Sequence, residues 1–331
     1  MRPNLKFSAL MISALFSTPL ARANIVGTDA QNFNPTTSGL DFVTVQSART
    51  LDPGVFNIGL FLNGAANTLS FLDDADPDAK SSRTKIKDTL LSADLNFGVG
   101  LGKKIDIGLS LPFLLKQDIE NSDRVAYFST TGNTEQRLNA KYRFFESDDF
   151  SAATVLSVNR NNIANNPYTG SSPGLITNLE LAFLKKINDS WLGLNLGHRW
   201  RDSGKSLIGT FGIDPIPNQG IYSLAWSRMF AGTDSKLIIE VFGSFPSQTS
   251  SSNSNFTDRD RSNLETLLGI KNQYSENLAL HAGAGTEIVQ GFGTPDYRIY
   301  AGINWNFGPL FQKTVKQAYQ QKIQEQPQVT P

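Results

Sequence analysis

The chain has 331 residues, of which 39% are hydrophobic and 18% charged, and 30 basic and 30 acidic residues balance to a net charge of zero. This balance excludes the basic footprint of a nucleic-acid-binding protein. The chain has no cysteine, so disulfides, thiolate metal sites and a lipid-modified N-terminal cysteine are excluded as well. A transmembrane helix is also excluded, because no run of about 20 consecutive apolar residues occurs.

The N-terminus has the pattern of an export signal. Arg2 and Lys6 form a positive region, residues 7–16 form a short apolar core, and Ala21-Arg22-Ala23 is a small-residue cleavage site. The apolar core is too short to cross a bilayer. The sequence therefore predicts a signal peptide over residues 1–23, removed after Ala23.

Beyond residue 40 the sequence alternates with a period of two, which is typical of β-strands. In 105–111 every odd residue is apolar, and 91–100, 137–144 and 297–307 alternate in the same way. The alternation places charged residues on the face opposite the apolar one. We predict that this face lines a lumen, with these residues as candidates: Asp94, Asp106, Arg137, Lys141, Arg143, Glu180, Arg199, Glu240, Glu265, Lys271, Glu287 and Arg298.

The predicted connections alternate between short and long. Turn-forming residues mark short turns, and longer polar stretches lie between them. This alternation is the plan of a transmembrane barrel with its long loops outside the cell. A soluble β-sandwich requires neither this alternation nor a single phase of charges on nearly every strand. The short turns are at 51–54, 102–104, 146–149, 188–190, 232–234 and 275–277, and the long loops are near 68–86, 117–134, 160–173, 202–217, 247–262 and 288–295.

Aromatic residues near the predicted strand ends fit the belts that flank a membrane's apolar core. These residues are Phe113, Tyr142, Phe144, Trp200, Phe230, Phe245, Trp305 and Phe307.

Six long loops predict six hairpins, and hence an all-β, antiparallel, up-and-down transmembrane barrel of 12 strands over residues 55–307. Residues 24–54 are left over, and they form a lumen segment, a rim segment or an extra strand. Because bacterial single-chain barrels have even strand numbers, the last alternative would raise the count to 14. Residues 308–331 form a short periplasmic tail, with a short helix that braces the barrel rim or with a frayed end.

The last predicted strand carries a candidate assembly signal. Gly302, Trp305 and Phe307 stand where outer-membrane barrels have a glycine followed by aromatic or apolar residues three and five positions later. The polar position before the glycine is Tyr300, which fits less well. The resemblance implies that the barrel-assembly machinery binds this strand by edge pairing.

Two further stretches resemble one group of barrels. Phe33-Asn34-Pro35 with 39–51, and the stretch 291–298, are similar to the start and the last-strand entry of barrels attached to OmpA-like proteins in predatory and related proteobacteria. Relatives commonly continue into acidic calcium-binding repeats and a peptidoglycan-binding domain. Only 24 residues follow Phe307, so we expect no cell-wall anchoring by such a domain.

No catalytic residue is predicted. A 12-stranded outer-membrane phospholipase family places its catalytic His and Ser two residues apart on one strand. Here His198 is followed at that distance by Trp200, and His281 by Gly283. We expect His198 in the interface belt and His281 in the lumen wall.

The acidic run 73–78 resembles the start of a calcium loop, since Asp74, Asp76 and Asp78 have the spacing of the first EF-hand ligands. However, Ala79 replaces the glycine of that loop, and Lys85 stands where its bidentate Glu belongs. We therefore interpret it as a solvated acidic loop and predict no metal and no cofactor. Weak divalent binding or bridging to lipopolysaccharide stays a minor alternative.

The lumen charges have both signs, so either they pair into a network that seals the interior or they line a narrow water-filled route. Inward glycines such as Gly108 and Gly193 favour open space. We predict a passive, porin-like channel for small solutes in the bacterial outer membrane, without strong ion selectivity. The alternative is a structural or surface-adhesion barrel that uses its long loops, and an enzyme ranks third. Expected partners are outer-membrane lipid, lipopolysaccharide and the assembly machinery; the oligomeric state is left open.

Overall fold

The computed structural model describes residues 31–68, 87–119, 131–163, 168–205, 215–247 and 261–310. The predicted signal peptide, the acidic run 73–78 and the tail beyond residue 310 lie outside these residues, so the structure does not bear on them.

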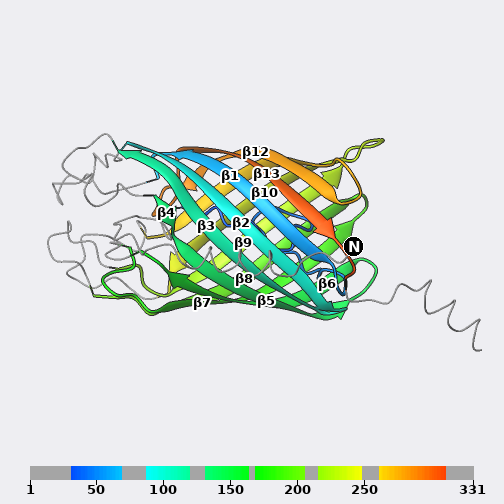
Figure 1. Cartoon of the computed structure of the whole chain (residues 1–331), viewed down its shortest axis with the longest axis horizontal. Coiled ribbons are helices and arrows are strands. Elements are labelled where there is room, and N and C mark those ends of the chain that lie inside the picture. The colour runs from blue at the N-terminus through cyan, green and yellow to red at the C-terminus, as the bar shows by residue number, and fades with distance from the viewer. Residues whose placement is uncertain are drawn as a thin grey trace, which may run out of the picture.

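The described residues form a closed antiparallel barrel (Figure 1). Each strand pairs with the next along the chain, and β13 pairs with β1. β4 is a two-residue piece separated from β5 by Thr134 alone, and both pair with β3, so together they occupy one place in the wall. The barrel therefore has 12 strands, which confirms the predicted fold and the preferred count. The strands are β1 Phe56–Ala66, β2 Asp88–Gly102, β3 Ile105–Ile119, β4 Gly132–Asn133, β5 Glu135–Glu146, β6 Phe150–Asn161, β7 Leu175–Ile187, β8 Ser190–Arg201, β9 Gln219–Met229, β10 Ser235–Pro246, β11 Asn263–Gln273, β12 Leu278–Val289 and β13 Tyr297–Phe307.

The barrel closes where the first and last strands meet. β1 and β13 pair along their whole length, from Phe56 opposite Phe307 to Ala66 opposite Tyr297. The rings of Phe56 and Phe307 stack, with centroids 5.4 Å apart. Closure leaves no unpaired strand edge, which is what a β-structure needs in order to cross a lipid bilayer.

The two ends of the barrel differ in their connections, as the sequence predicts. At one end, called the short-turn end, strands are joined by residues 103–104, 147–149, 188–189, 230–234 and 274–277. Asn188 adopts a left-handed conformation (φ 52°) in one of these turns, and asparagine tolerates that region. The opposite end, called the long-loop end, carries the connections 67–87, 120–131, 162–174, 202–218, 247–262 and 290–296.

The outer face of the wall is apolar. Leucines and isoleucines from all round the barrel are exposed there, including Leu60, Ile107, Leu138 and Ile299. Six of the aromatic residues predicted to flank this band are also exposed: Tyr142, Phe144, Trp200, Phe230, Phe245 and Trp305. Phe113 and Phe307 are half-buried. This face suits lipid and not water. No helix long and apolar enough to cross a membrane occurs among the described residues.

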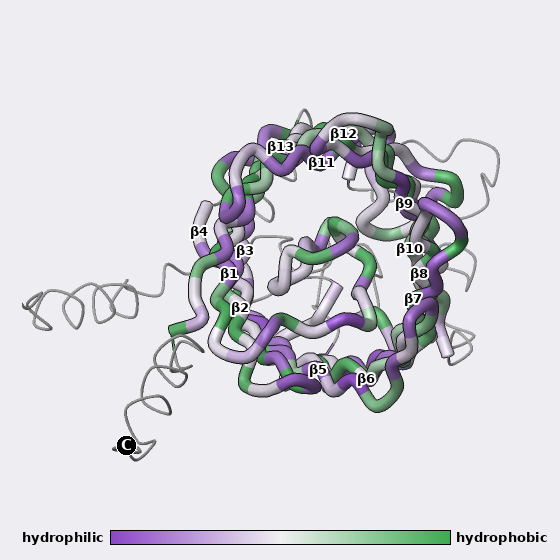
Figure 2. The backbone as a smooth tube through the Cα atoms, turned by 90° about the vertical axis from the view of Figure 1, so that its right-hand side faces the viewer, coloured by the Kyte–Doolittle hydropathy of each residue, from purple (hydrophilic) through white to green (hydrophobic). Residues whose placement is uncertain are grey.

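The chain enters the wall at β1 only after it has passed through the interior. Figure 2 looks along the barrel and shows backbone inside the ring of strands. Residues 31–51, called the inner segment below, lie there in irregular conformation, with Phe33, Phe42, Val43 and Val45 almost fully buried. The structure thus places residues 31–51 in the lumen.

Candidate functional site

The inner segment is held by charged side chains of the wall that hydrogen-bond to its backbone. The Glu240 carboxylate on β10 accepts bonds from the Val43 amide at 2.6 Å, the Thr44 amide at 3.0 Å and the Thr44 hydroxyl at 2.6 Å. The Lys271 ammonium on β11 donates to the carbonyl oxygens of Gly39 at 2.6 Å and Leu40 at 2.8 Å. These bonds satisfy backbone groups that no ladder pairs, and charged partners make them strong.

Similar contacts hold the segment against the opposite side of the wall. Asp106 on β3 accepts the Leu51 amide at 3.1 Å, and Lys141 on β5 donates to the Arg49 carbonyl at 3.2 Å. On β8, the Asn195 amide group bonds both the N–H and the C=O of Gln46, at 2.8 and 2.9 Å. The segment is thus fixed to the wall along its length.

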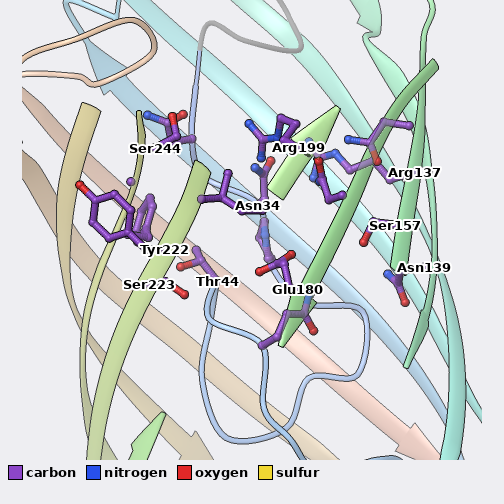
Figure 3. Close-up of a pocket in the computed structure, with 18 of the residues that line it drawn as sticks. Asn34, Thr44, Arg137, Asn139, Ser157, Glu180, Arg199, Tyr222, Ser223 and Ser244 are labelled. Carbon is purple, nitrogen blue, oxygen red and sulfur yellow. Dashed lines mark hydrogen bonds between the residues drawn. The ribbon is translucent and has the colours of Figure 1, made fainter. Parts of the chain in front are cut away.

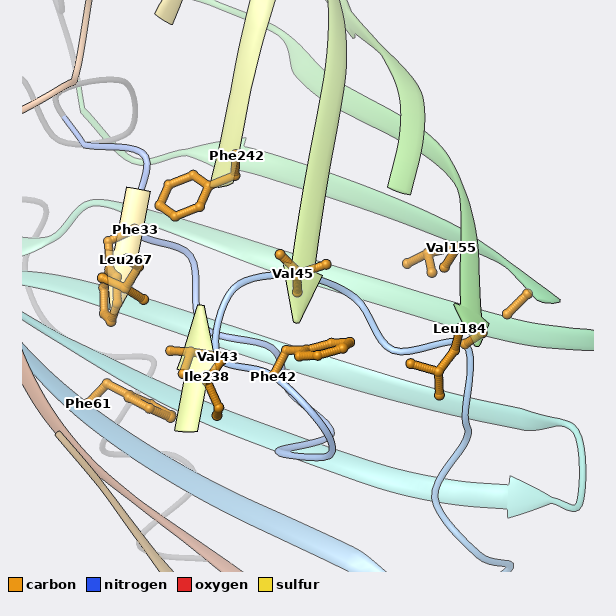
Figure 4. Packing of buried hydrophobic residues seen from close by; sticks show 14 of the residues in the cluster. Phe33, Phe42, Val43, Val45, Phe61, Val155, Leu184, Ile238, Phe242 and Leu267 are labelled. Atoms are coloured by element: carbon orange, nitrogen blue, oxygen red, sulfur yellow. The ribbon is translucent and has the colours of Figure 1, made fainter. Parts of the chain in front are cut away.

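Apolar packing adds to these bonds in the short-turn half of the lumen (Figure 4). The segment contributes Phe42, Val43 and Val45, and the wall contributes a matching set of inward-facing side chains. Buried apolar side chains of this kind stabilise by about 1.5–3 kcal/mol each. The wall residues of this apolar cluster are Phe61, Ala153, Val155, Ala182, Leu184, Ala225, Ile238, Phe242, Leu267 and Tyr300.

Inward glycines accommodate the segment. A Cβ on Gly193 would come within 2.5 Å of the Phe42 ring, and a Cβ on Gly108 would come within 2.5 Å of the Thr37 Cβ. The expectation that these glycines leave open space is therefore wrong for both positions. They remove bulk from the wall, but the inner segment fills the space.

The segment also carries its own polar cluster, which the sequence pattern does not predict. Asp41 pairs with Arg49 at 3.1 Å and accepts the Ser47 hydroxyl at 2.6 Å. The Arg49 guanidinium lies 4.2 Å from the centroid of the Trp191 ring on β8. The only sequence signal was the presence of polar residues in 39–51, a stretch whose strand periodicity is weak.

In the long-loop half the lumen is not filled. A cavity of about 140 Å³ lies between the inner segment and the wall from β3 to β11 (Figure 3). Arg137, Arg199 and Glu180 are its charged lining residues, and amides and hydroxyls make up most of the remainder. A smaller pocket shares Arg137, Asn159 and Arg199 with the cavity and adds Glu135 and Arg201, which stand at the long-loop ends of their strands.

The cavity stops where the inner segment meets the wall. Along β7 the inward residues run from Asn178 and Glu180, which line the cavity, to Ala182 and Leu184, which belong to the apolar cluster. The two hydrogen bonds between Gln46 and Asn195 lie at the level of Ala182, which is opposite Asn195 in the register of β7 and β8. The arrangement is a polar chamber closed toward the short-turn end.

The structure brings most of the predicted lumen charges into contacts of three kinds. Asp106, Lys141, Glu240 and Lys271 bind the inner segment, as described above. Arg298 and Glu265 form a fully buried pair at 2.5 Å, with Arg298 also donating to Asn63 at 2.8 Å. In the long-loop half, Arg137 pairs with Glu135 and lies 3.8 Å from Asp94.

The remaining predicted charges lie apart from these groups. Arg143 pairs with Glu146 at 2.6 Å at the short-turn rim. Glu287 on β12 lies opposite Glu265 in register. Arg199 donates to Asn178 at 3.0 Å, whereas no hydrogen bond or ion pair of Glu180 is found among the described residues. Several of the predicted lumen charges thus hold a peptide segment, which was not part of either predicted outcome, a sealing salt-bridge network or an open route.

The candidate assembly residues lie on β13, which closes the barrel. Gly302 faces inward against the Phe61 ring, and Trp305 faces outward with half of its surface exposed. Phe307 stacks on Phe56 at the seam. Recognition by the assembly machinery is not tested by this geometry and stays a prediction.

The two histidines occupy packed positions. His281 is buried in the lumen wall, where Nε2 lies 2.8 Å from the Asn304 amide nitrogen and the ring meets Phe61 edge-on. His198 lies against Trp200, with ring centroids 4.6 Å apart.

No family model and no curated protein matches the chain. Among solved structures, an outer membrane channel from Pseudomonas putida F1 is similar, with a TM-score of 0.59 and 11% identity over 78% of this chain and 98% of that one. The NanC porin has a TM-score of 0.48 at 7% identity over 76% and 98%. The translocator domain of the autotransporter NalP from Neisseria meningitidis also has 0.48, at 10% identity over 78% and 90%.

At sequence identities this low, structural similarity indicates a similar fold but not a similar function. The two TM-scores below 0.5 do not support a conclusion even about the fold. The chain is a closed barrel whose fold is similar to that of the Pseudomonas putida channel. No sequence match supports the narrower resemblance to barrels of OmpA-like proteins.

Proposed function

We propose that the protein is an outer-membrane channel through which small polar solutes diffuse passively. The observation that carries this proposal is the polar chamber beside the inner segment, with Arg137, Glu180 and Arg199 in its lining. Charged and amide side chains in a narrow lumen replace part of a solute's hydration shell. Both signs of charge are present, so strong ion selectivity is not expected.

Passage to the short-turn end requires the inner segment to move. Gln46 is bonded to Asn195, and Phe42 and Val45 pack in the apolar cluster beyond it. The segment is irregular and covalently continuous with β1. In this proposal it shifts within the lumen while the wall strands stay paired. In this proposal the described arrangement is the closed one.

The apolar outer face supports a place in the outer membrane, with lipid and lipopolysaccharide as surroundings. Insertion by the barrel-assembly machinery through β13, and kinship with the barrels of OmpA-like proteins, stand as proposals on the residues given above. We propose no enzymatic activity, since both histidines are engaged in packing contacts.

Conductance of the purified full-length protein in planar bilayers tests the proposal. We expect discrete single-channel openings. In Ser157→Trp a large side chain enters the chamber and should block them. Leu156→Trp is the matched control, because the neighbouring side chain is 44% exposed on the outer face.

A protein that migrates as a folded, heat-modifiable barrel but stays silent in bilayers contradicts the channel. Equal currents from Ser157→Trp and Leu156→Trp would contradict the route through the chamber. A structural or surface-adhesion barrel would then be the better proposal. Loss of surface binding after shortening of the long loops would support it.

A further inference from the structure

Three amide side chains around the chamber have polar atoms without a partner. Asn32 Nδ2, Asn34 Oδ1 and Asn159 Oδ1 are each buried and make no hydrogen bond among the described residues. Asn159 as a whole is only 8% exposed. An unsatisfied buried polar group costs about 1–3 kcal/mol, so these three amides are a part of the lining that gains stability from a hydrogen-bonding partner.

The groups offered are both donors and acceptors. Asn32 presents an N–H, whereas Asn34 and Asn159 present carbonyl oxygens, and Ser157 adds a hydroxyl that serves in either role. The Glu180 carboxylate adds acceptors. A solute hydroxyl also donates and accepts, so a ligand with several hydroxyls matches this mixture better than a ligand with one kind of group.

One part of the chamber lining is apolar. Phe242 lines the chamber and packs in the apolar cluster (Figure 4). An aromatic ring beside amides and a carboxylate provides contact for C–H groups while the polar groups fix orientation. A hydroxylated ring compound has both kinds of surface.

The charges around the chamber balance. Arg137, Arg199 and Arg201 are matched by Glu135, Glu180 and Asp94, so three basic residues stand with three acidic ones. A balanced set gives no excess attraction for an anion or a cation. It favours a neutral ligand.

The volume sets the size of the ligand. At about 140 Å³, and with a share of about 30 Å³ for each water in the liquid, the chamber holds roughly five waters. One solute with about a dozen non-hydrogen atoms, the size of a hexose, displaces a similar number.

We propose that the chamber is a binding site for a neutral, polyhydroxylated solute of monosaccharide size. The proposal rests on the proposed function, because it names the class of solute that the channel takes. The ligand's hydroxyls bond to Asn32, Asn34, Asn159 and Glu180, and its C–H face lies on Phe242.

Saturation-transfer NMR on the purified full-length protein, with D-glucose and D-galactose as probes, tests the site without requiring conductance. We expect saturation transfer from protein to at least one sugar, with affinity in the millimolar range. Glucosamine and glucuronate, the charged counterparts, should bind at least about threefold more weakly, an energy difference near 0.6 kcal/mol.

Ser157→Trp should abolish the sugar signal, and Leu156→Trp should leave it unchanged. Asn159→Leu, which keeps the size and removes the amide, should weaken binding about fivefold or more. Heat-modifiable migration of each variant controls for folding. Equal signals from Ser157→Trp and Leu156→Trp, or no signal from the folded wild-type protein with either sugar, overturn the site.

The two proposals fail separately. A protein that conducts but does not bind the sugars contradicts the site and leaves the channel standing. A protein that binds the sugars but stays silent in bilayers supports the site and contradicts the channel.

Discussion

The two halves of the lumen are built from the same strands, but they are filled in opposite ways. On β10, Ile238 and Glu240 in the short-turn half contact the inner segment, whereas Ser244 in the long-loop half lines the open chamber. In both halves the side chains point inward with the same period of two. Alternation therefore fixes the direction of a side chain, whereas the inner segment decides whether the space beside it is occupied.

The largest expected effect comes from locking the inner segment in place. The Thr37 hydroxyl and the Asn139 side-chain oxygen lie 3.1 Å apart, on the inner segment and on β5. Since the chain has no cysteine, the double variant Thr37→Cys with Asn139→Cys offers one pair for a disulfide. We expect oxidation to abolish single-channel openings and a reductant to restore them.

Each single cysteine variant serves as the control for this lock, and counting free thiols shows that the bond has formed. Undiminished currents from the oxidised double variant would show that solutes pass without movement of the inner segment.

Removal of apolar packing should have the next largest effect. Phe42 is 1% exposed and packs in the apolar cluster. Phe42→Ala should weaken docking of the inner segment by about 3–5 kcal/mol, as large-to-small changes in cores do. Limited proteolysis in detergent should then cut within residues 31–51 while the strands stay protected, and channels should open more often.

Phe42→Leu keeps most of the apolar volume and should lie between Phe42→Ala and the wild-type protein. If Phe42→Ala were cut no faster than the wild-type protein, the apolar cluster would not hold the segment.

Two glutamates at neighbouring levels of the lumen provide the sharpest comparison. Glu240→Ala leaves the backbone amides of Val43 and Thr44 without an acceptor, which should weaken docking by about 3 kcal/mol in all. Glu180→Ala removes a carboxylate that lines the chamber and should leave docking unchanged. Rates of proteolysis within residues 31–51 measure both. Equal rates of proteolysis for Glu240→Ala and Glu180→Ala would contradict the different roles given to the two glutamates.

The smallest expected effect concerns ion preference. Glu180→Gln removes the one carboxylate in the chamber lining and should lower the permeability of cations relative to anions on the order of twofold. Reversal potentials in a salt gradient measure this ratio. A change as large as tenfold would show that the lumen charges are not balanced as described.

The strands and turns of the wall were predictable from the sequence because they depend on residues that are close together in the sequence. In 105–111 successive side chains alternate between the two faces of the strand. A tight turn such as Asn188–Asp189 is predicted by its residue types. The inward direction of Glu240 and Lys271 followed from the same pattern. The count of 12 strands followed from the alternation of short and long connections.

The contents of the lumen were not predictable in the same way. The inner segment has only a weak period, because its residues meet different parts of the wall. Val43 binds Glu240 across 197 positions of sequence, and Gly39 binds Lys271 across 232. The sequence showed which charges point inward, but it did not show that a backbone carbonyl or amide would be their partner.

The passage of the chain through the interior before β1 has a consequence for assembly. Residues 31–51 are the first of the described chain to be synthesised, yet their partners on β10 and β11 are among the last. A ring already sealed between β1 and β13 would have to admit the segment through an end, whereas a ring still open admits it from the side. Entry of the inner segment into the lumen and pairing of β1 with β13 then occur together. The 12 strands assemble around the segment. The slow step in refolding would be this late, long-range event.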